Sequence, residues 1–521
     1  MTEQNDLVKR RYEELEHIKS MGINPYPHRF DVSHYSKDII NNFVDPADDE
    51  QKEKAKEVII SVAGRIMAIR KMGKACFVHI KDEQGKIQLY IRKDDVGEES
   101  YNLLKLLDIG DIIGAAGYVF RTKTGEVSVH CNSFTLLTKS LYPLPVVKEE
   151  VLESGEKVVY DAFADVELRY RQRYIDLIVN DGVKEVFIKR TKIIQSIKRT
   201  LEDKSFFEVE TPTLQSVYGG ANAKPFITHH NSLDMRLYLR ISNELFLKRL
   251  IVGGFNRVYE FVRDFRNEGI DRTHNPEFTQ VEWYQAYGDY FDSMNMFEQV
   301  CEAACIAANG TTKVMYGETE IDFKAPWKRI KMVDAIKEVT DLDVMSMSKD
   351  EIINHMVKNE IDFDRKISHS KGLLISALFE ETCESGLVQP TFITEHPIDT
   401  TPLCKPLREY SMEQLEQMKN DPDAVIFVER FEPYINKWEL GNSYTELNDP
   451  VLQRALLEQQ VERGRGGEEE THPMDEDFLR AIEIGMPPTT GVGLGVDRLV
   501  MLLTNSQTIR DVIFFPLMRQ L

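Results

Sequence analysis

Long apolar runs are absent from this 521-residue sequence. A membrane-spanning helix needs about eighteen or more consecutive apolar residues, and no segment reaches that length. The first residues, MTEQNDLVKRRYEELEHIKSMG, are charged where a signal peptide would have an apolar core. Both absences argue against a membrane-spanning or exported protein, so we expect a cytoplasmic one.

Cysteine is also scarce, with six residues in the whole chain. Cysteines spread so thinly do not form a disulfide framework. Cys301 and Cys305 lie four apart on a predicted helix, but no second Cys/His pair with zinc-binding spacing accompanies them. We therefore expect buried thiols, with a metal site as the weaker alternative.

Positive charge is outnumbered, since 65 Lys and Arg face 86 Asp and Glu and the formal net charge is -21. Such a chain is repelled on average by a polyanion, which argues against a protein that coats nucleic acid. Residues 58–92 are a local exception, with seven basic against two acidic side chains. This stretch indicates either a local nucleic-acid contact or a solvated basic face.

The length exceeds what one hydrophobic core supports, so two or more domains are expected. Residues 1–57 predict a helical extension. Residues 58–145 contain about five β-rich runs broken by glycines, with one helical segment near 98–107 and a Pro-rich exit at 141–145. This pattern is typical of a small β-barrel of the OB type.

Residues 146–521 show mixed helical and strand periodicity, which predicts an α+β domain around an antiparallel sheet. Residues 329–390 are rich in helix formers and predict a helical insertion in that domain. Residues 463–477, RGRGGEEETHPMDED, predict an irregular loop.

The stretch YEFVRDFRNEGIDRTHNPEFTQVEWYQAYGDY predicts two strands around a polar loop, with charges of both signs among its aromatics. Side chains two apart share a strand face, which places four residues together: Phe278, Gln280, Glu282 and Tyr284. Val281 and Trp283 take the opposite, packed face. We interpret the polar face as a ligand floor. An exposed face with cross-strand ion pairs would explain the charges but not the aromatics.

A second strand candidate, YINKWELGNSYTELND, places Asn442, Tyr444 and Glu446 on one face, with Glu432 and Glu439 upstream. Carboxylates that face a cavity repel one another unless cations neutralise them, so Mg²⁺, an ammonium group or arginine is expected there. Solvated surface acids are the alternative for any single residue.

A third stretch, PPTTGVGLGVDRLVMLLT, alternates glycines at 491, 493 and 495 before a helix that carries Arg498. Small residues on one strand face let a flat ligand lie close beneath an arginine. Glycine packing against the helix is the alternative. Together the three stretches predict a nucleotide triphosphate site without a P-loop, in which Phe278 and Arg498 sandwich a base.

These stretches carry a resemblance. FRNEG followed by HNPEFT resembles motif 2 of class II aminoacyl-tRNA synthetases, GLGVDRLVMLLT resembles motif 3, and SFFEVETPTL resembles motif 1. GGANAKPFITHHNSLDMRLYLRISNELFLKRLIVGGFNRVYE and ELGNSYTELNDP are similar to the lysyl branch of the aspartyl, asparaginyl and lysyl subgroup. With the barrel, the similarity covers nearly the whole chain from about residue 58.

The resemblance implies an ATP-dependent ligase that forms lysyl-adenylate and then charges tRNA, with Mg²⁺ as cofactor and a homodimer formed through motif 1. It implies catalytic roles for Arg266 and Arg498. The implied ATP-binding residues are Arg266, Glu268, His274, Asn275, Phe278, Glu439 and Arg498. The implied lysine-binding residues are Gly220, Glu244, Arg266, Glu282, Tyr284, Asn442, Tyr444 and Glu446. Glu432 and Glu439 are the implied Mg²⁺ ligands, and the implied anticodon-binding residues are Arg70, Phe77, Gln88 and Glu126.

Three places depart from the family pattern. Ser205 stands where motif 1 has a glycine, which leaves the local turn open. Thr273 stands where some lysine enzymes have arginine, which leaves a phosphate role of Arg272 open. Residues 406–429 are longer than expected and have no assigned role.

The side-chain pocket must decide the amino acid, because relatives with the same barrel use aspartate or asparagine. A pocket for aspartate needs a facing cation, whereas Glu282, Glu446 and the Tyr284 hydroxyl suit an ammonium group. The alternatives are an aspartyl- or asparaginyl-tRNA synthetase, a non-catalytic tRNA-binding paralogue, or ligation of lysine to a protein acceptor. For Phe77, simple packing in the barrel core is the alternative.

Overall fold

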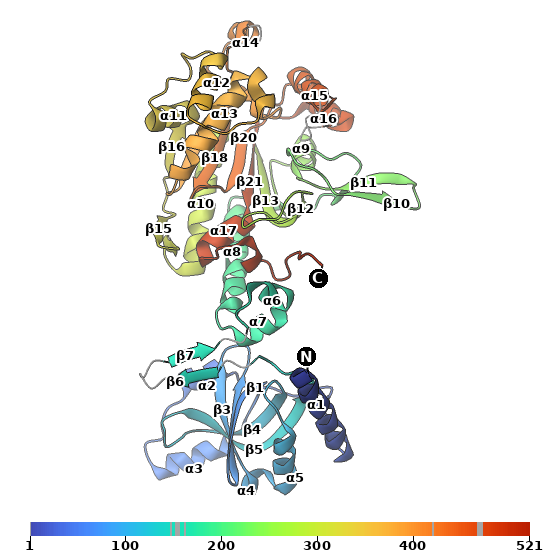
Figure 1. Cartoon of the computed structure of the whole chain (residues 1–521), viewed down its shortest axis with the longest axis vertical. Coiled ribbons are helices and arrows are strands. Elements are labelled where there is room, and N and C mark those ends of the chain that lie inside the picture. Colours follow the sequence, from blue (N-terminus) through green and yellow to red (C-terminus); the bar gives the residue numbers. More distant parts are fainter. Residues whose placement is uncertain are drawn as a thin grey trace. The chain divides into compact units, whose positions relative to one another are not determined.

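The computed structural model describes residues 2–145, 148–151, 157–160, 163–418, 421, 423–465 and 473–520. The chain divides into two compact units, Met1–Ala164 and Asp165–Leu521. This division falls later than the boundary after residue 145 that the Pro-rich exit predicts. Figure 1 shows the β-barrel in the first unit and the large sheet in the second.

The first unit is built on a closed five-stranded barrel with the order β1-β2-β3-β5-β4. Its strands are β1 Ile60–Met72, β2 Ala75–Lys81, β3 Lys86–Arg92, β4 Ile112–Arg121 and β5 Val127–Thr138. Helices α4 Lys93–Val96 and α5 Glu98–Leu103 lie between β3 and β4, followed by the short η1 Leu104–Leu106. The OB-type barrel is therefore confirmed.

Alternation along the strands fills the barrel. Along β2, Cys76, Val78 and Ile80 are buried inside while the residues between them are only partly buried. Gly117 marks a close approach, because a Cβ there would collide with the carbonyl of His130 on β5.

Three helices precede the barrel: α1 Thr2–Ser20, α2 Ser36–Asn42 and α3 Asp49–Glu57. Arg11 ties α1 to the barrel unit by donating to the carbonyls of Ile109 and Ser140, both at 2.9 Å. A two-stranded sheet of β6 Lys148–Val151 and β7 Lys157–Tyr160 follows the barrel.

The second unit contains a nine-stranded sheet with the path β16-β17-β18-β20-β21-β13-β12-β8, and β19 pairs with β18. Its strands are β8 Phe207–Glu208, β12 Arg257–Phe265, β13 Glu277–Ala286, β16 Lys328–Lys331, β17 Thr391–Pro397, β18 Phe427–Ile435, β19 Trp438–Glu439, β20 Gly441–Thr445 and β21 Thr489–Gly495. All pairs are antiparallel except β16 with β17 and β12 with β8. The predicted antiparallel α+β core is confirmed, with parallel pairs only toward its two edges.

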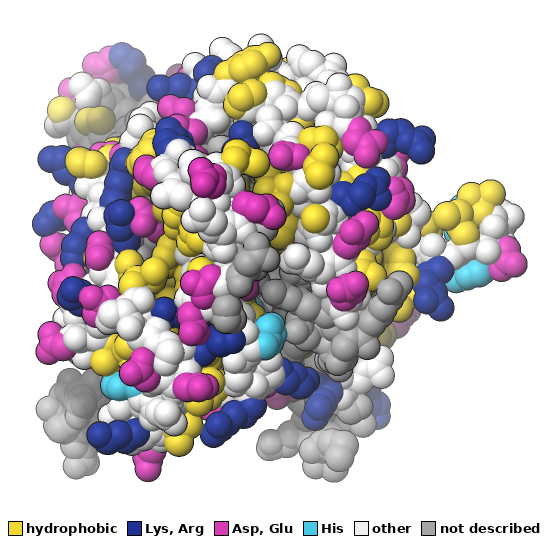
Figure 2. Space-filling view, turned by 90° about the horizontal axis from the view of Figure 1, so that it is seen from above, with side chains coloured by type: hydrophobic (Ala, Val, Ile, Leu, Met, Phe, Trp, Pro, Cys, Tyr) yellow, Lys and Arg dark blue, Asp and Glu magenta, His cyan; other side chains and the backbone are white. Residues whose placement is uncertain are grey.

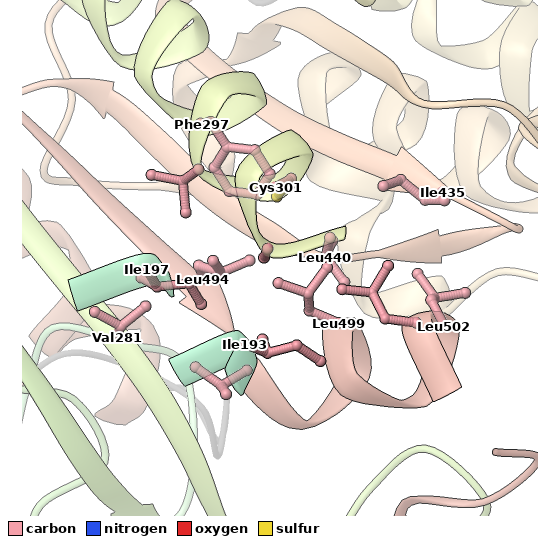
Figure 3. Packing of buried hydrophobic residues seen from close by; sticks show 14 of the residues in the cluster. Ile193, Ile197, Val281, Phe297, Cys301, Ile435, Leu440, Leu494, Leu499 and Leu502 are labelled. Carbon is pink, nitrogen blue, oxygen red and sulfur yellow. The ribbon is translucent and has the colours of Figure 1, made fainter. Parts of the chain in front are cut away.

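One sheet face carries the main core. Helices α8 Val183–Asp203, α10 Tyr290–Asn309 and α17 Val496–Thr504 bury their apolar stripes there. Figure 3 shows side chains from these helices meeting Val281, Leu494 and Ile435 of the sheet. Cys301 and Cys305 are both fully buried free thiols in this core, as predicted. The opposite face of β13 is left for the cavity described below.

The turn after α8 explains one departure from the family pattern. Ser205 has φ of 66°, a left-handed conformation that glycine adopts most easily. The backbone therefore keeps the turn that a glycine would make, and Phe206 after it is buried.

A helical segment lies between β16 and β17. It contains α11 Met332–Thr340, α12 Lys349–Lys358, η2 Arg365–His369 and α13 Lys371–Thr382. These helices share a core of their own, including Ile336, Ile352 and Leu378.

The remaining elements surround the sheet. They are α6 Val166–Arg171, α7 Arg173–Val179, β9 Leu214–Gln215, β10 Ile227–His230, β11 Met235–Leu239, α9 Glu244–Val252, β14 Lys313–Tyr316, β15 Thr319–Asp322, η3 Glu384–Gly386, η4 Ile398–Thr400, α14 Met412–Met418, α15 Pro450–Arg465, α16 Glu476–Gly485 and η5 Ile509–Asp511. Helix α15 extends into the predicted loop 463–477, and residues 466–472 of that loop lie outside the described residues. Arg408, in the unassigned segment 406–429, donates to Asp289 at 2.8 Å and to Glu429 at 2.5 Å.

On the face in Figure 2, acidic and basic side chains are interspersed without a broad field of one sign. Among the described residues, no helix is long and apolar enough to cross a membrane.

Candidate active site

A cavity of about 440 Å³ opens on the polar face of β13, β20 and β21. Its wall includes the four residues that strand alternation places together on β13: Phe278, Gln280, Glu282 and Tyr284. Val281 and Trp283 point into the main core on the other face. The polar strand face predicted by alternation therefore lines a cavity, and its role as a ligand floor stays a prediction.

Nearly all the second-unit residues predicted for the site lie on this wall. They are Gly220, Glu244, Arg266, Glu268, His274, Asn275, Phe278, Glu282, Tyr284, Glu432, Glu439, Asn442, Tyr444 and Arg498. Glu446 is the exception, because it lies behind the wall. A side chain built on wall residue Gly491 would collide with Glu446 Oε1 and with the Tyr284 ring.

Arg266 follows the end of β12, where the polar loop begins. Its guanidinium lies over the Phe278 ring, 5.1 Å from the centroid. Its backbone N–H donates to the Pro276 carbonyl at 2.9 Å, which closes the base of the loop. Arg266 Nε is buried without a hydrogen-bond acceptor among the described residues. This guanidinium can therefore receive an anionic ligand group.

Arg498, at the start of α17, is held by two contacts. Its Nη1 donates to the Glu439 carbonyl at 2.5 Å, and its Nη2 lies 2.9 Å from His274 Nε2. His274 Nδ1 in turn lies 2.7 Å from the Asp271 carboxylate. Partial burial acts to raise the pKa of Asp271, but hydrogen bonds from Thr273 and His274 outweigh it and lower the pKa to about 2.

Glu282 forms the buried carboxylate at the centre of the floor. It accepts hydrogen bonds from Ser242 at 2.9 Å, Gln280 at 2.7 Å and Tyr284 at 3.1 Å. Burial, together with repulsion from Asp264 and Glu244, raises the pKa of Glu282 to about 8. None of its three donors is charged, so a cationic ligand group would stabilise its ionised form.

Glu244 begins α9 and reaches the same end of the cavity. Its Oε1 accepts from Lys248 Nζ at 2.5 Å and from the Tyr444 hydroxyl at 2.7 Å. Lys248 Nζ also contacts Glu446 Oε2. Lys248 is not among the residues predicted from the sequence, although a lysine four residues after Glu244 on a largely apolar helix is a signal.

Gly220 borders the same end of the cavity with φ of 86°. A Cβ there would lie 2.8 Å from Ser242 Oγ and 3.0 Å from Glu244 Cβ. Only glycine leaves this approach open.

Glu432 and Glu439 offer oxygen ligands for a hard cation. Glu432 accepts from Arg430 at 2.5 Å and from the Tyr434 hydroxyl at 2.8 Å. Burial and the neighbouring Glu432 raise the pKa of Glu439. No group of three or more His, Cys, Asp or Glu with metal-binding geometry occurs among the described residues. Two carboxylates that also need ligand phosphates or water fit the way proteins bind Mg²⁺.

The four barrel residues lie on β1, β2, β3 and the β4–β5 turn. Arg70 pairs with Phe77 in the strand register. Gln88 Nε2 donates to Glu126 at 2.7 Å, and His79 Nε2 lies 2.9 Å from the same carboxylate. His79 is not among the anticodon-binding residues predicted from the sequence.

Phe77 does not belong to the barrel core. It is only partly buried and alternates with the inward Cys76 and Val78. Its ring lies 4.9 Å from that of Tyr90, which also contacts Phe120 and His130. Partial exposure of this ring is not what simple core packing of Phe77 predicts.

Comparisons with known proteins agree with this geometry. Residues 165–519 match the family of tRNA synthetases class II (D, K and N), and residues 60–137 match the OB-fold nucleic acid binding domain. The chain is 49% identical over 516 residues to a lysine–tRNA ligase of Pelotomaculum thermopropionicum, covering 99% of this chain and 95% of the relative. It is 48% identical to a lysine–tRNA ligase of Porphyromonas gingivalis, covering 99% of this chain and 86% of the relative. It is also 48% identical to one of Azobacteroides pseudotrichonymphae, covering 98% of this chain and 97% of the relative. The chain belongs to the class II tRNA synthetase family of the D, K and N enzymes.

Proposed function

We propose that the protein is a lysine–tRNA ligase, which activates lysine with ATP and transfers it to the 3′ end of its tRNA. One observation carries the choice of lysine: buried carboxylates of Glu244 and Glu282 line one end of the cavity, and Glu446 lies directly behind it. Arg266 lies on the same wall and suits the carboxylate of the amino acid. The two ammonium groups of lysine match the acidic end.

In the first step, the lysine carboxylate attacks the α-phosphorus of ATP in line, releasing pyrophosphate and leaving lysyl-adenylate. No general base is needed, because a carboxylate is already an anion at neutral pH. Arg266 neutralises charge that develops at the α-phosphate, and Arg498 stacks on the adenine whose other face meets Phe278. Glu268 accepts from the adenine amino group, while His274 contacts the phosphates and Asn275 supports this part of the ATP site.

At the amino acid end, Gly220 and Glu244 receive the α-amino group. Glu282, Tyr284, Asn442, Tyr444 and Glu446 surround the side chain. Mg²⁺ would be held by Glu432 and Glu439 and would supply neutralisation of the phosphate charges.

In the second step, a ribose hydroxyl at the tRNA 3′ end attacks the adenylate carbonyl, and AMP leaves. The barrel provides tRNA recognition, with a splayed anticodon base stacked on Phe77 and its edges bonded to Gln88, Arg70 and Glu126. The partly exposed ring of Phe77 beside these polar groups supports this assignment.

An aspartyl or asparaginyl enzyme is the nearest rival. Aspartate would place its side-chain carboxylate against Glu282, whose neighbours are acids, two hydroxyls and the Gln280 amide, none of them a cation. A site built for one polar partner rejects ligands without it by roughly 10⁴ to 10⁵. A non-catalytic paralogue is disfavoured because the ATP-site residues line one cavity.

A homodimer through motif 1 forms part of the proposal. Large apolar side chains of motif 1 itself remain exposed, Phe207 at 60% and Leu214 at 50%. A second copy of the chain would cover them. The cytoplasm is the proposed location.

Amino-acid-dependent pyrophosphate exchange tests the proposal. With ATP, Mg²⁺ and each standard amino acid in turn, lysine should stimulate exchange and aspartate and asparagine should not. Stimulation by aspartate, or by no amino acid at all, would refute the assignment.

A further inference from the structure

Helix α9 buries a lysine beside the acidic end of the cavity. The Lys248 side chain has no exposed surface, and its ammonium group contacts the carboxylates of Glu244 and Glu446. The rings of Tyr444 and Phe478 lie 5.5 Å and 5.8 Å from Lys248 Nζ. A buried ammonium group is tolerated only when carboxylates compensate it. Burial acts to lower the pKa of Lys248, but Glu244 and Glu446 outweigh it and raise the pKa, so the group stays charged.

The contacts of Glu446 are unequal. Both carboxylate oxygens are buried without a hydrogen bond of standard geometry among the described residues. Oε2 forms an ion pair with Lys248 Nζ, whereas no ion pair to Oε1 occurs in the described part of the chain. That free oxygen lies directly behind Gly491 and the Tyr284 ring, both of which line the cavity. Lys248 therefore anchors one oxygen, and the other is buried without a partner from the described residues just behind the cavity floor.

The charges at this end can be counted. Three carboxylates, those of Glu244, Glu282 and Glu446, are accompanied by one buried cation, Lys248. A fourth buried acid, Asp264, also repels Glu282 but has the Arg240 guanidinium 3.5 Å away. The donors to Glu282 are uncharged. With the three carboxylates and Lys248 ionised, the pocket lacks two positive charges, which is the number that lysine carries on its α- and ε-ammonium groups.

We propose that Lys248 is a positioning residue for substrate specificity: it holds Glu446 with one oxygen toward the cavity and leaves the pocket in need of two ammonium groups. The inference rests on the proposed lysine specificity. It differs from a purely structural role for Lys248 because it predicts a selective loss of amino acid binding.

Replacing Lys248 by methionine removes the charge and keeps an unbranched apolar chain. In pyrophosphate exchange, K248M should raise the KM for lysine roughly 30-fold or more, because Glu446 loses its anchor and is left as an uncompensated acid. The KM for ATP should stay within about threefold, since the nucleotide contacts lie elsewhere on the wall. A structural role would instead lower the amount of active enzyme and leave the KM for lysine unchanged.

The double variant K248M/E446Q tests whether the two residues act together. E446Q alone should also raise the KM for lysine. The KM of the double variant should stay within about threefold of that of the single variant with the higher KM, instead of rising by the product of both effects. The matched control is R249M, next along α9, whose guanidinium bonds Asp475 at 2.9 Å and Asp477 at 3.1 Å, away from the cavity. It should leave the KM for lysine unchanged.

The outcomes separate the inference from the proposed function. If wild-type enzyme does not respond to lysine, the proposed function fails. If it responds but K248M keeps the wild-type KM for lysine, or raises both KM values together, only the inference fails. If K248M does not fold, the comparison of the double variant with E446Q decides: a similar KM for lysine supports the inference, and a much higher one in the double variant overturns it.

Discussion

At the scale of single residues, Glu282 shows how burial sets the chemistry of the site. Its carboxyl group has three uncharged donors and a pKa raised to about 8 by burial and by Asp264 and Glu244. On the proposed assignment of Glu282 to the lysine side chain, the ligand ammonium group stabilises the ionised form, so lysine binding at neutral pH releases a proton from this carboxyl group. The affinity for lysine then depends on pH.

The KM for lysine in pyrophosphate exchange should fall roughly tenfold between about pH 6.5 and pH 8, because the free Glu282 carboxyl increasingly exists as the anion that lysine requires. The KM for ATP, measured in parallel, should not follow this trend. E282Q should bind lysine weakly and lose the slope. A wild-type KM for lysine that is flat over this range would contradict the assignment of Glu282.

Asp264, on β12, is another buried acid with a raised pKa. Both of its carboxylate oxygens lack hydrogen-bond donors among the described residues. Arg240 Nε lies 3.5 Å away. Burial raises the pKa of Asp264 to about 7 despite Arg266 and Arg240. Since the folded-state pKa exceeds the unfolded-state value, ionisation destabilises the fold progressively as pH rises from about 4 through 7.

D264N should therefore stabilise the ligand-free protein at pH 8, by up to about 4 kcal/mol, and the gain should shrink toward zero near pH 4. Thermal unfolding of both proteins across this pH range, at one scan rate, measures the difference. A constant difference in Tm at every pH would show that the effect is not caused by ionisation of Asp264.

The site residues that could be predicted from the sequence are those whose positions follow from the periodicity of a single strand. Phe278, Glu282 and Tyr284 were found because strand periodicity fixes their common face. Lys248 and the Asp271 contact to His274 were missed, because their roles depend on neighbours brought together only by folding or by loop geometry.

At the scale of elements, side-chain alternation predicts correctly which residues face the cavity within a strand, but not beyond the end of the strand. Asn442 and Tyr444 lie on β20 and line the cavity as predicted. Glu446 lies just beyond that strand. Its backbone forms a bridge with Cys404 and donates to the Thr489 carbonyl at 2.8 Å, and its side chain sits behind the wall. The sequence pattern does not reveal where a strand ends, so the pocket depth could not be predicted.

Strand β2 presents Phe77 on its outer face, which gives a test of the barrel assignment. F77A should leave lysine-dependent pyrophosphate exchange unchanged and raise the KM for tRNA roughly 5- to 100-fold, because a stacked base contributes about 1 to 3 kcal/mol. Aminoacylation with varied tRNA concentrations measures the effect.

Phe30 supplies a matched control, because its ring packs against Gly114 on β4 rather than against Arg70 and Gln88. F30A should cost stability without a specific rise in the KM for tRNA. Equal effects of F77A and F30A on charging would assign Phe77 a packing role only.

At the scale of the whole molecule, the proposed tRNA recognition and the proposed chemistry fall in different compact units. The barrel unit has its own core, from Ile18 to Leu136, and the second unit has three further cores between Ile193 and Ile513. The broad fold class was predictable because two sequence patterns differ clearly: short β-rich runs broken by glycines in residues 58–145, and mixed helix and strand periodicity in residues 146–521. The boundary was not, since residues 146–164 carry no strong signal and the compact units divide only at Ala164.

This separation predicts that residues 165–521 alone keep adenylate formation. Every residue that lines the cavity lies between Gly220 and Ile509, so no side chain of the barrel unit is needed for the first step. Lysine-dependent pyrophosphate exchange by the isolated second unit should stay within about tenfold of the full chain, whereas tRNA charging should fall by roughly 100-fold or more, because the stacking and hydrogen bonds to the anticodon are lost. The full chain should lose charging when the anticodon of its tRNA is substituted, and the isolated unit should be indifferent to that substitution. Loss of pyrophosphate exchange in an isolated unit that still unfolds cooperatively would show that the barrel unit contributes to the chemistry itself.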